Sequence, residues 1–140
     1  MNEWSFEVLG MPVPQGSIEF KGMRKTKDGR SIPIMVHRNS HELEKWREAV
    51  GWAAKAVGVI EASASQPIAI ECLFRRPRAA SNHGTYPVMP PDLDRLLRAI
   101  GDALKGIAYV DDGQVVDWHG SKEYGPAQAE ITVRWLGQLI

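Results

Sequence analysis

Four aspartates are the residues in this chain best suited to chemistry, because they form two close pairs on either side of a strongly patterned segment. Asp92 and Asp94 form the first pair, and Asp111 and Asp112 form the second. Carboxylates without histidine or cysteine companions suit a hard divalent cation such as Mg²⁺ or Mn²⁺. The sequence therefore predicts a metal site, provided that the two pairs converge in the fold.

The segment between the two pairs has the period of an amphipathic helix. Asp92 suits its N-cap, and Gly106 follows it as a stop signal. Two prolines precede Asp92 and predict a corner there, where its side chain can turn toward that of Asp94. We expect a helix of about 13 residues, because apolar residues recur at helical spacing: Leu93, Leu96, Leu97, Ile100, Ala103 and Leu104.

Structural roles alone could also explain both pairs of aspartates. One carboxylate can cap a helix, and a second in the first turn interacts favourably with the helix dipole. The run Asp111-Asp112-Gly113 is by itself most often a turn. A helix of about 13 residues carries the chain about 20 Å at a rise of 1.5 Å per residue. Convergence therefore requires the loop after the helix to fold back.

The remaining segments predict an α+β domain over residues 1–140. In it, two helices pack on one face of a mixed sheet, and a basic hairpin turns at Asp28-Gly29. The last two predicted strands are expected to pair with each other in antiparallel fashion. The expected elements, besides the helix above, are strands at Trp4–Leu9, Lys21–Thr26, Ser31–Val36, Ile68–Phe74, Gln114–Glu123 and Ala129–Leu136, and a helix at Ser40–Val57.

Positive charge is concentrated in two places, although the net charge at pH 7 is zero. Basic clusters of this kind are suited to DNA phosphates, which give affinity without reading sequence. A solvated, charged hairpin is the alternative explanation for the first cluster. The residues expected to bind DNA are Lys21, Arg24, Lys25, Lys27 and Arg30 in the hairpin, and Arg75, Arg76 and Arg78 after the strand that starts at Ile68.

Other features of the composition indicate a cytoplasmic protein. No apolar run is long enough to cross a membrane, and the first residues lack the basic start of a signal peptide. Cys72 is the one cysteine, so it cannot form an internal disulfide, and its apolar neighbours predict a buried thiol. Glu71 on the same strand could supply a further metal ligand or simply face solvent, and His83 and His119 lack partners at ligand spacing.

The segment that carries the aspartates resembles the RusA family of Holliday junction resolvases, which is common in phages and prophages. The resemblance lies in PDLD, a leucine-rich helix containing GDALKGIAY, and then DDGQVVDWHGSK. It implies that Asp92, Asp94 and Asp112 are the metal-binding acids, with Asp111 as a possible additional acid. The stretch GMPVPQGS near the N-terminus also resembles the lead-in of this family.

Three basic positions can be compared with the same family. Family members usually carry Asn where this chain has Arg95, and a functional Lys where it has Arg98. Arginine keeps the positive charge but cannot give up its proton, so Arg98 can bind phosphate but cannot transfer a proton. Lys122 matches a lysine that family members often carry at the end of the following strand.

The resemblance implies a Mg²⁺-dependent endonuclease, with Mn²⁺ able to substitute, that acts in DNA recombination and repair. It implies four-way junctions as substrate, paired nicks that leave 5′-phosphate and 3′-hydroxyl ends, and a homodimer. Arg98 and Lys122 would then offset charge in the transition state. Two alternatives remain open, namely a non-catalytic nucleic-acid-binding module and a metal nuclease that acts on flaps or other branched DNA.

Overall fold

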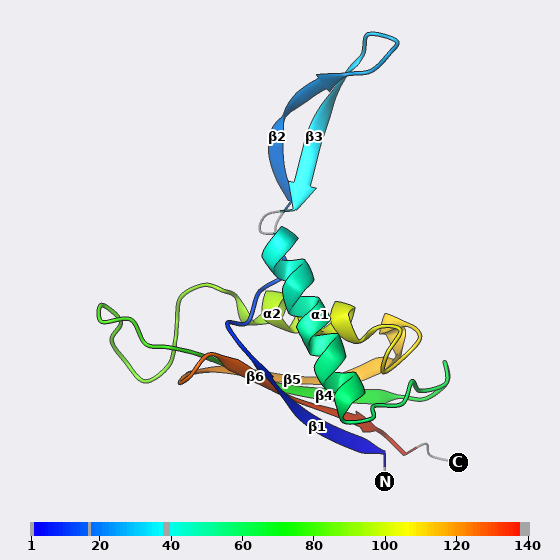
Figure 1. The fold of residues 1–140 in the computed structure, drawn as a ribbon, viewed down its shortest axis with the longest axis vertical. Coiled ribbons are helices and arrows are strands. Elements are labelled where there is room, and N and C mark those ends of the chain that lie inside the picture. The colour runs from blue at the N-terminus through cyan, green and yellow to red at the C-terminus, as the bar shows by residue number, and fades with distance from the viewer. Residues whose placement is uncertain (1, 17, 38–39, 138–140) are drawn as a thin grey trace.

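The computed structural model describes residues 2–16, 18–37 and 40–137. Its centre is a four-stranded mixed sheet in the order β1-β6-β4-β5, with two helices on one face (Figure 1). This confirms the predicted α+β class. The elements are β1 (Glu3–Leu9), β2 (Ile18–Lys25), β3 (Ser31–His37), α1 (Ser40–Ala56), β4 (Ile68–Arg76), α2 (Leu93–Leu104), a 3₁₀ turn η1 (Asp112–Gln114), β5 (Val115–Tyr124) and β6 (Gln128–Trp135).

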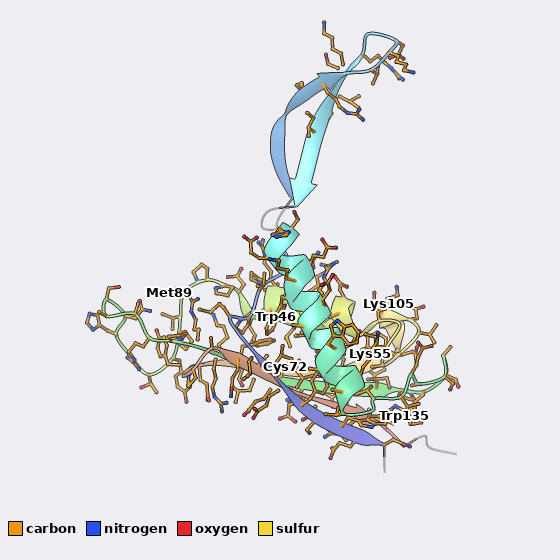
Figure 2. All side chains as sticks on the ribbon, in the orientation of Figure 1. Trp46, Lys55, Cys72, Met89, Lys105 and Trp135 are labelled. Atoms are coloured by element: carbon orange, nitrogen blue, oxygen red, sulfur yellow. The ribbon has the colours of Figure 1, made fainter. Side chains whose placement is uncertain are left out.

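The core lies between the two helices and the sheet, where apolar residues at helical spacing meet alternate residues of the strands. Figure 2 shows Trp46 of α1 and Cys72 of β4 in this layer. Val50, Ile100 and Val133 are fully buried there. The apolar stripe of α2 therefore faces the core, whereas Asp94, Arg98 and Lys105 on the other side of the helix are exposed.

The predicted antiparallel pairing of the last two strands is wrong. β4 lies between them, parallel to β5 and antiparallel to β6. Burial explains this order, since alternate residues of β4 from Ile68 to Phe74 are almost completely buried, whereas Val116 and Trp118 of β5 are exposed. An interior position, hydrogen-bonded on both sides, suits the more apolar strand. Residues 125–127 cross the end of β4, where the Gly125 amide donates to the Arg76 carbonyl.

The hairpin of β2 and β3 forms a separate two-stranded sheet that extends beyond the start of α1 (Figure 1). The Thr26 amide donates to the Arg30 carbonyl over 2.8 Å and closes the turn. Gly29 has φ of 85°, which a glycine adopts without steric cost. Asp28 accepts a hydrogen bond from the Thr26 hydroxyl, which lowers the pKa of its carboxyl group. The predicted hairpin is confirmed.

Neither helix in the ranges listed above is both long and apolar enough to cross a membrane.

Candidate active site

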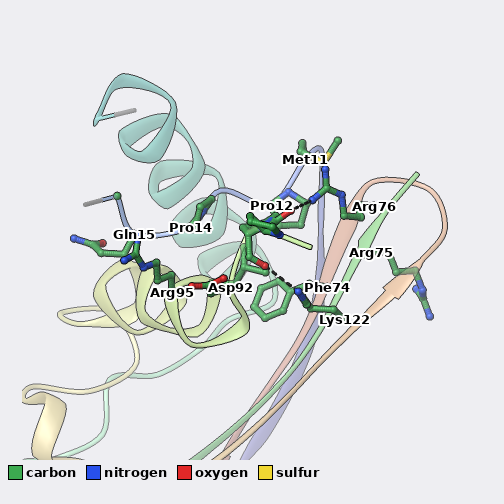
Figure 3. Close-up of a pocket in the computed structure, with 14 residues that line it drawn as sticks. Met11, Pro12, Pro14, Gln15, Phe74, Arg75, Arg76, Asp92, Arg95 and Lys122 are labelled. Atoms are coloured by element: carbon green, nitrogen blue, oxygen red, sulfur yellow. Dashed lines mark hydrogen bonds between the residues drawn. The ribbon is translucent and has the colours of Figure 1, made fainter. Parts of the chain in front are cut away.

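A groove of about 590 Å³ opens at the N-terminal end of α2 (Figure 3). The chain enters α2 through this groove, and the connection after β1 forms one of its walls. That connection is held to the first turn of the helix, because the Gln15 amide donates to the Arg95 carbonyl. The groove is lined by Met11, Pro12, Pro14, Gln15, Gly16, Phe74, Arg75, Arg76, Pro90, Pro91, Asp92, Arg95, Leu96 and Lys122.

Two cations hold the corner that leads into the helix. The ammonium of Lys122 donates to the carbonyl oxygens of Met89 and Pro91, over 3.1 and 3.0 Å. The guanidinium of Arg76 donates to the Pro90 carbonyl over 2.6 Å. Figure 3 shows both side chains pointing at the corner from the ends of β5 and β4. Three successive carbonyls before the first aspartate are therefore fixed by charge-assisted hydrogen bonds.

Asp92 is the N-cap residue of α2, as predicted, but its side chain does not cap the helix. Its backbone is extended, with φ of −70° and ψ of 140°, and its carboxylate lies on the groove. Asp94 is exposed in the first turn, where the helix dipole stabilises negative charge. Capping thus fails to explain Asp92, which leaves its carboxylate available for a ligand in the groove.

Asp111 and Asp112 lie at the other end of α2. The carboxylate of Asp112 is 3.9 Å from the ammonium of Lys105, the C-cap residue of the helix. A helix of 12 residues is about 18 Å long at 1.5 Å per residue. The expected convergence of both acid pairs within one chain is therefore wrong, and no three acid, histidine or cysteine side chains among the described residues form a group that could hold a metal.

The loop that carries Asp112 is fixed by the buried amide of Gln114. Its oxygen accepts from the Val110 and Asp111 amides, and its nitrogen donates to the carbonyls of Ser63 and Gln66, over distances between 2.7 and 3.1 Å. The Asp111 side chain caps the 3₁₀ turn by accepting from the backbone. Asp111 thus has a structural role, and the loop is tied to the connection before β4 rather than to the first acid pair.

Arg98 and Lys105 lie on the same side of α2 as Asp94, because they follow it by four and eleven residues. Both are exposed. Arg98 thus lies about one helical turn from Asp94, which is where a side chain that contacts a phosphate beside this acid is expected. Lys105 was missed in the sequence analysis, although a cation one residue before the glycine stop signal is a recognisable pattern.

The predicted DNA-binding cations differ in their surroundings. Arg75 donates to Glu123 and Glu130 over 2.6 and 2.9 Å, and these hydrogen bonds raise the pKa of its guanidinium. Arg78 stacks on the ring of Tyr124, 4.4 Å from its centre. Arg24, Lys25, Lys27 and Arg30 are exposed on the hairpin, whereas the side chain of Lys21 lies outside the described residues.

The sheet face opposite the helices is acidic, which makes it a poor surface for DNA. Glu71 is exposed on this face, away from the groove, so it is not a ligand for the same site. His119 lies 3.3 Å from Asp117 there, and burial raises the pKa of the Cys72 thiol on the opposite, covered face. By strand alternation the open face carries Glu3, Glu7, Glu71, Asp117, Glu123 and Glu130 against Arg75 and Arg134.

Comparison with protein families gives a match to endodeoxyribonuclease RusA over residues 12–134. The matched region contains the groove, both aspartate pairs and Lys122. A search of curated proteins finds no significant match. Because the family match covers most of the 140 residues, the chain belongs to the RusA family of endodeoxyribonucleases, which resolve Holliday junctions.

Proposed function

We propose that this protein is a Mg²⁺-dependent endonuclease that cuts four-way DNA junctions by paired nicks, leaving 5′-phosphate and 3′-hydroxyl ends. The observation that supports the proposal best is the carboxylate of Asp92, which occupies the N-cap position without capping and instead lines a groove rich in cations. A carboxylate in a cationic groove is the arrangement expected where a metal and a phosphate bind together.

We infer that the acids at the corner would hold a magnesium ion. Mg²⁺ is usually bound through one or two carboxylates, with water and substrate phosphate as the other ligands. Asp92 and Asp94 provide the two carboxylates. When bound, the cation supplies Lewis-acid polarisation of the scissile phosphate and a water of lowered pKa. Mn²⁺ has similar ligand preferences and would substitute.

The cations of the chain have separate roles in this proposal. Lys122 and Arg76 hold the carbonyls of the corner, so they position Asp92 rather than contact the reacting phosphate. Arg98, one turn after Asp94, offsets charge on the phosphate in the transition state. The exposed cations of the hairpin bind the phosphates of a junction arm.

The position of Asp112 supports a homodimer. If Asp112 acts together with Asp92 and Asp94, the 18 Å or so of α2 between them rules out one chain as the source of all three. Asp112 lies beside the C-terminal end of α2. In a two-fold dimer whose α2 helices run antiparallel, Asp112 of one copy would lie close to the corner before α2 in the other copy. We therefore propose a homodimer with two composite sites, which matches the two-fold symmetry of a four-way junction.

A substrate panel tests this function. The protein is incubated with a four-way junction, a flap and a linear duplex of the same sequences, in Mg²⁺, in Mn²⁺ and in EDTA. We expect symmetric paired nicks in the junction alone, ligatable ends, and no cutting in EDTA. Junction binding without cutting in either metal would show a non-catalytic binding module, and preferred cutting of the flap would overturn the substrate assignment.

A further inference from the structure

We propose that Tyr86 and Val88 form a wedge that inserts between bases at the branch point of the DNA substrate. The two residues lie in the connection between β4 and α2, shortly before the corner that holds Asp92. The proposal rests on the proposed function, because it specifies which side chains would recognise the branch point. It also predicts how the cutting rate depends on base pairing there.

The first observation is that apolar side chains are exposed in this connection. Val88 is 89% exposed, which is the highest value for a large apolar residue among the described residues, and Tyr86 is 64% exposed. Pro87 between them is buried. The backbone is thus anchored at Pro87, while the side chains on either side of it are directed into solvent. Exposed apolar side chains grouped in this way mark a binding surface.

The second observation is that the chain around the wedge is held firmly. The three carbonyls of residues 89–91 accept hydrogen bonds from the side chains of Lys122 and Arg76. The ring of Pro87 fixes the φ angle of that residue near −65°. Because the segment is already ordered in the free protein, the wedge loses little conformational entropy when it enters a base stack.

The third observation is the position of the wedge relative to the candidate active site. Figure 1 shows the connection extending past the end of the sheet before it returns to α2. Val88 precedes Asp92 by four residues, and four residues span at most about 14 Å. Successive nucleotides of one strand are about 3.4 Å apart along the helix axis. A base in contact with Val88 therefore lies within about four nucleotides of a phosphate at Asp92.

The charge of the connection favours DNA as the occupant of this surface. Residues 75–91 contain three arginines and no acid. Arg78 is exposed, and its guanidinium stacks on the ring of Tyr124. A guanidinium positioned in this way can bind a backbone phosphate while the wedge contacts the bases. An apolar protein partner would not need these cations, whereas a DNA strand has both anionic phosphates and flat apolar base faces.

A branch point suits a wedge better than a continuous duplex does. An apolar side chain that enters a base step breaks the stacking of two bases, and the cost is smallest where bases are already unpaired or mismatched. The base pairs at a branch point end their arms, so their faces can be uncovered without interrupting the stack within an arm. An aromatic ring stacks on any base. Tyr86 would therefore recognise the branch without reading its sequence.

A fluorescent base tests insertion of the wedge. 2-Aminopurine, which fluoresces more strongly when it is unstacked, is placed in the base pair next to the branch point of a four-way junction. Protein is added to saturation in Ca²⁺, with binding followed by gel shift. We expect the unchanged protein to raise the fluorescence, and the double variant Tyr86→Ser/Val88→Ser to bind without raising it.

The matched control for this test is Tyr86→Phe/Val88→Ile, which keeps the apolar surface and should give the full rise in fluorescence. Both side chains are exposed, so neither double variant removes a core contact. Equal fluorescence from junctions bound to the unchanged protein and to the serine variant would overturn the proposal.

Mismatched bases at the branch point test the role of the wedge in cutting. On a fully paired junction in Mg²⁺, we expect Tyr86→Ser/Val88→Ser to cut about 10-fold more slowly than the unchanged protein, which is the effect of losing one stack between a base and an aromatic ring. On a junction with mismatches at the branch point, the bases are already unstacked, so the variant should cut within about twofold of the unchanged protein.

A defect of the same size on both junctions would indicate that the two residues only support the structure of the connection, and would overturn the proposal. Failure of the nuclease proposal would appear separately, as intact junctions in Mg²⁺ with the unchanged protein. The fluorescence test would still decide whether the wedge inserts, because it requires binding and not cutting.

Discussion

Asp94→Asn is expected to lower the rate of junction cutting about 1,000-fold while leaving junction binding nearly unchanged. The exchange keeps the size of the side chain and removes the negative charge that would bind the metal. Loss of one group that stabilises a transition state electrostatically costs a factor of about 100 to 1,000, and a loss of 1,000-fold corresponds to about 4 kcal/mol. Single-turnover cutting and a gel-shift titration in Ca²⁺ measure the two quantities.

The control for this prediction is Glu71→Gln. It makes the same change at an exposed acid on the open face of the sheet, away from the groove. We expect its cutting rate to stay within about twofold of the unchanged protein. Asp94 is also exposed, so its replacement removes only a dipole interaction of about 0.3 to 1 kcal/mol, and the protein stays folded. Equal cutting rates for the two variants would remove Asp94 from the site.

Gln114→Leu is expected to lower the free energy of unfolding by about 3 kcal/mol. Leucine has a similar volume but leaves the Val110 and Asp111 amides without their acceptor and the Ser63 and Gln66 carbonyls without their donor. A buried polar group that loses its partner costs about 1 to 3 kcal/mol. Urea denaturation monitored by tryptophan fluorescence measures the change.

The same exchange at Gln128, a half-buried residue of β6, is the matched control and should cost less than about 1 kcal/mol. Because Gln114 fixes the loop before β5, its replacement should also slow junction cutting at temperatures where the protein is still folded. A Gln114→Leu protein as stable as the control would show that the four hydrogen bonds contribute little to the position of this loop.

The elements of this fold follow largely from local patterns in the sequence. The spacing of apolar residues at every third or fourth position predicts the helix α2. The Asp-Gly pair predicts the turn of the hairpin. Both patterns lie within a few consecutive residues, so they can be recognised in the sequence alone. The order of strands does not follow in the same way. β5 and β6 are consecutive and suggest a hairpin, but the most apolar strand, β4, takes the interior position between them.

The candidate site likewise has one part that short sequence patterns predict and another part that depends on contacts between distant residues. The corner at Asp92 could be predicted, since two prolines and a helix start are adjacent in the sequence. The position of Asp112 could not, because the loop before β5 is set by hydrogen bonds from Gln114 to residues about 50 positions earlier. The contact of Lys122 with two carbonyls of the corner likewise joins segments more than 30 residues apart.

The composite site can be tested directly by mixing two inactive variants. Asp94→Asn and Asp112→Asn proteins are combined, allowed to exchange subunits and assayed on a four-way junction. With composite sites, each mixed dimer contains one site that has lost both acids and one that is intact. Because random exchange of an equal mixture makes about half of the dimers mixed, nicking activity should return to about one quarter of that of the unchanged protein. If each chain instead supplied all three acids of its own site, both sites of the mixed dimer would be defective, and a mixture as inactive as the separate variants would contradict the account.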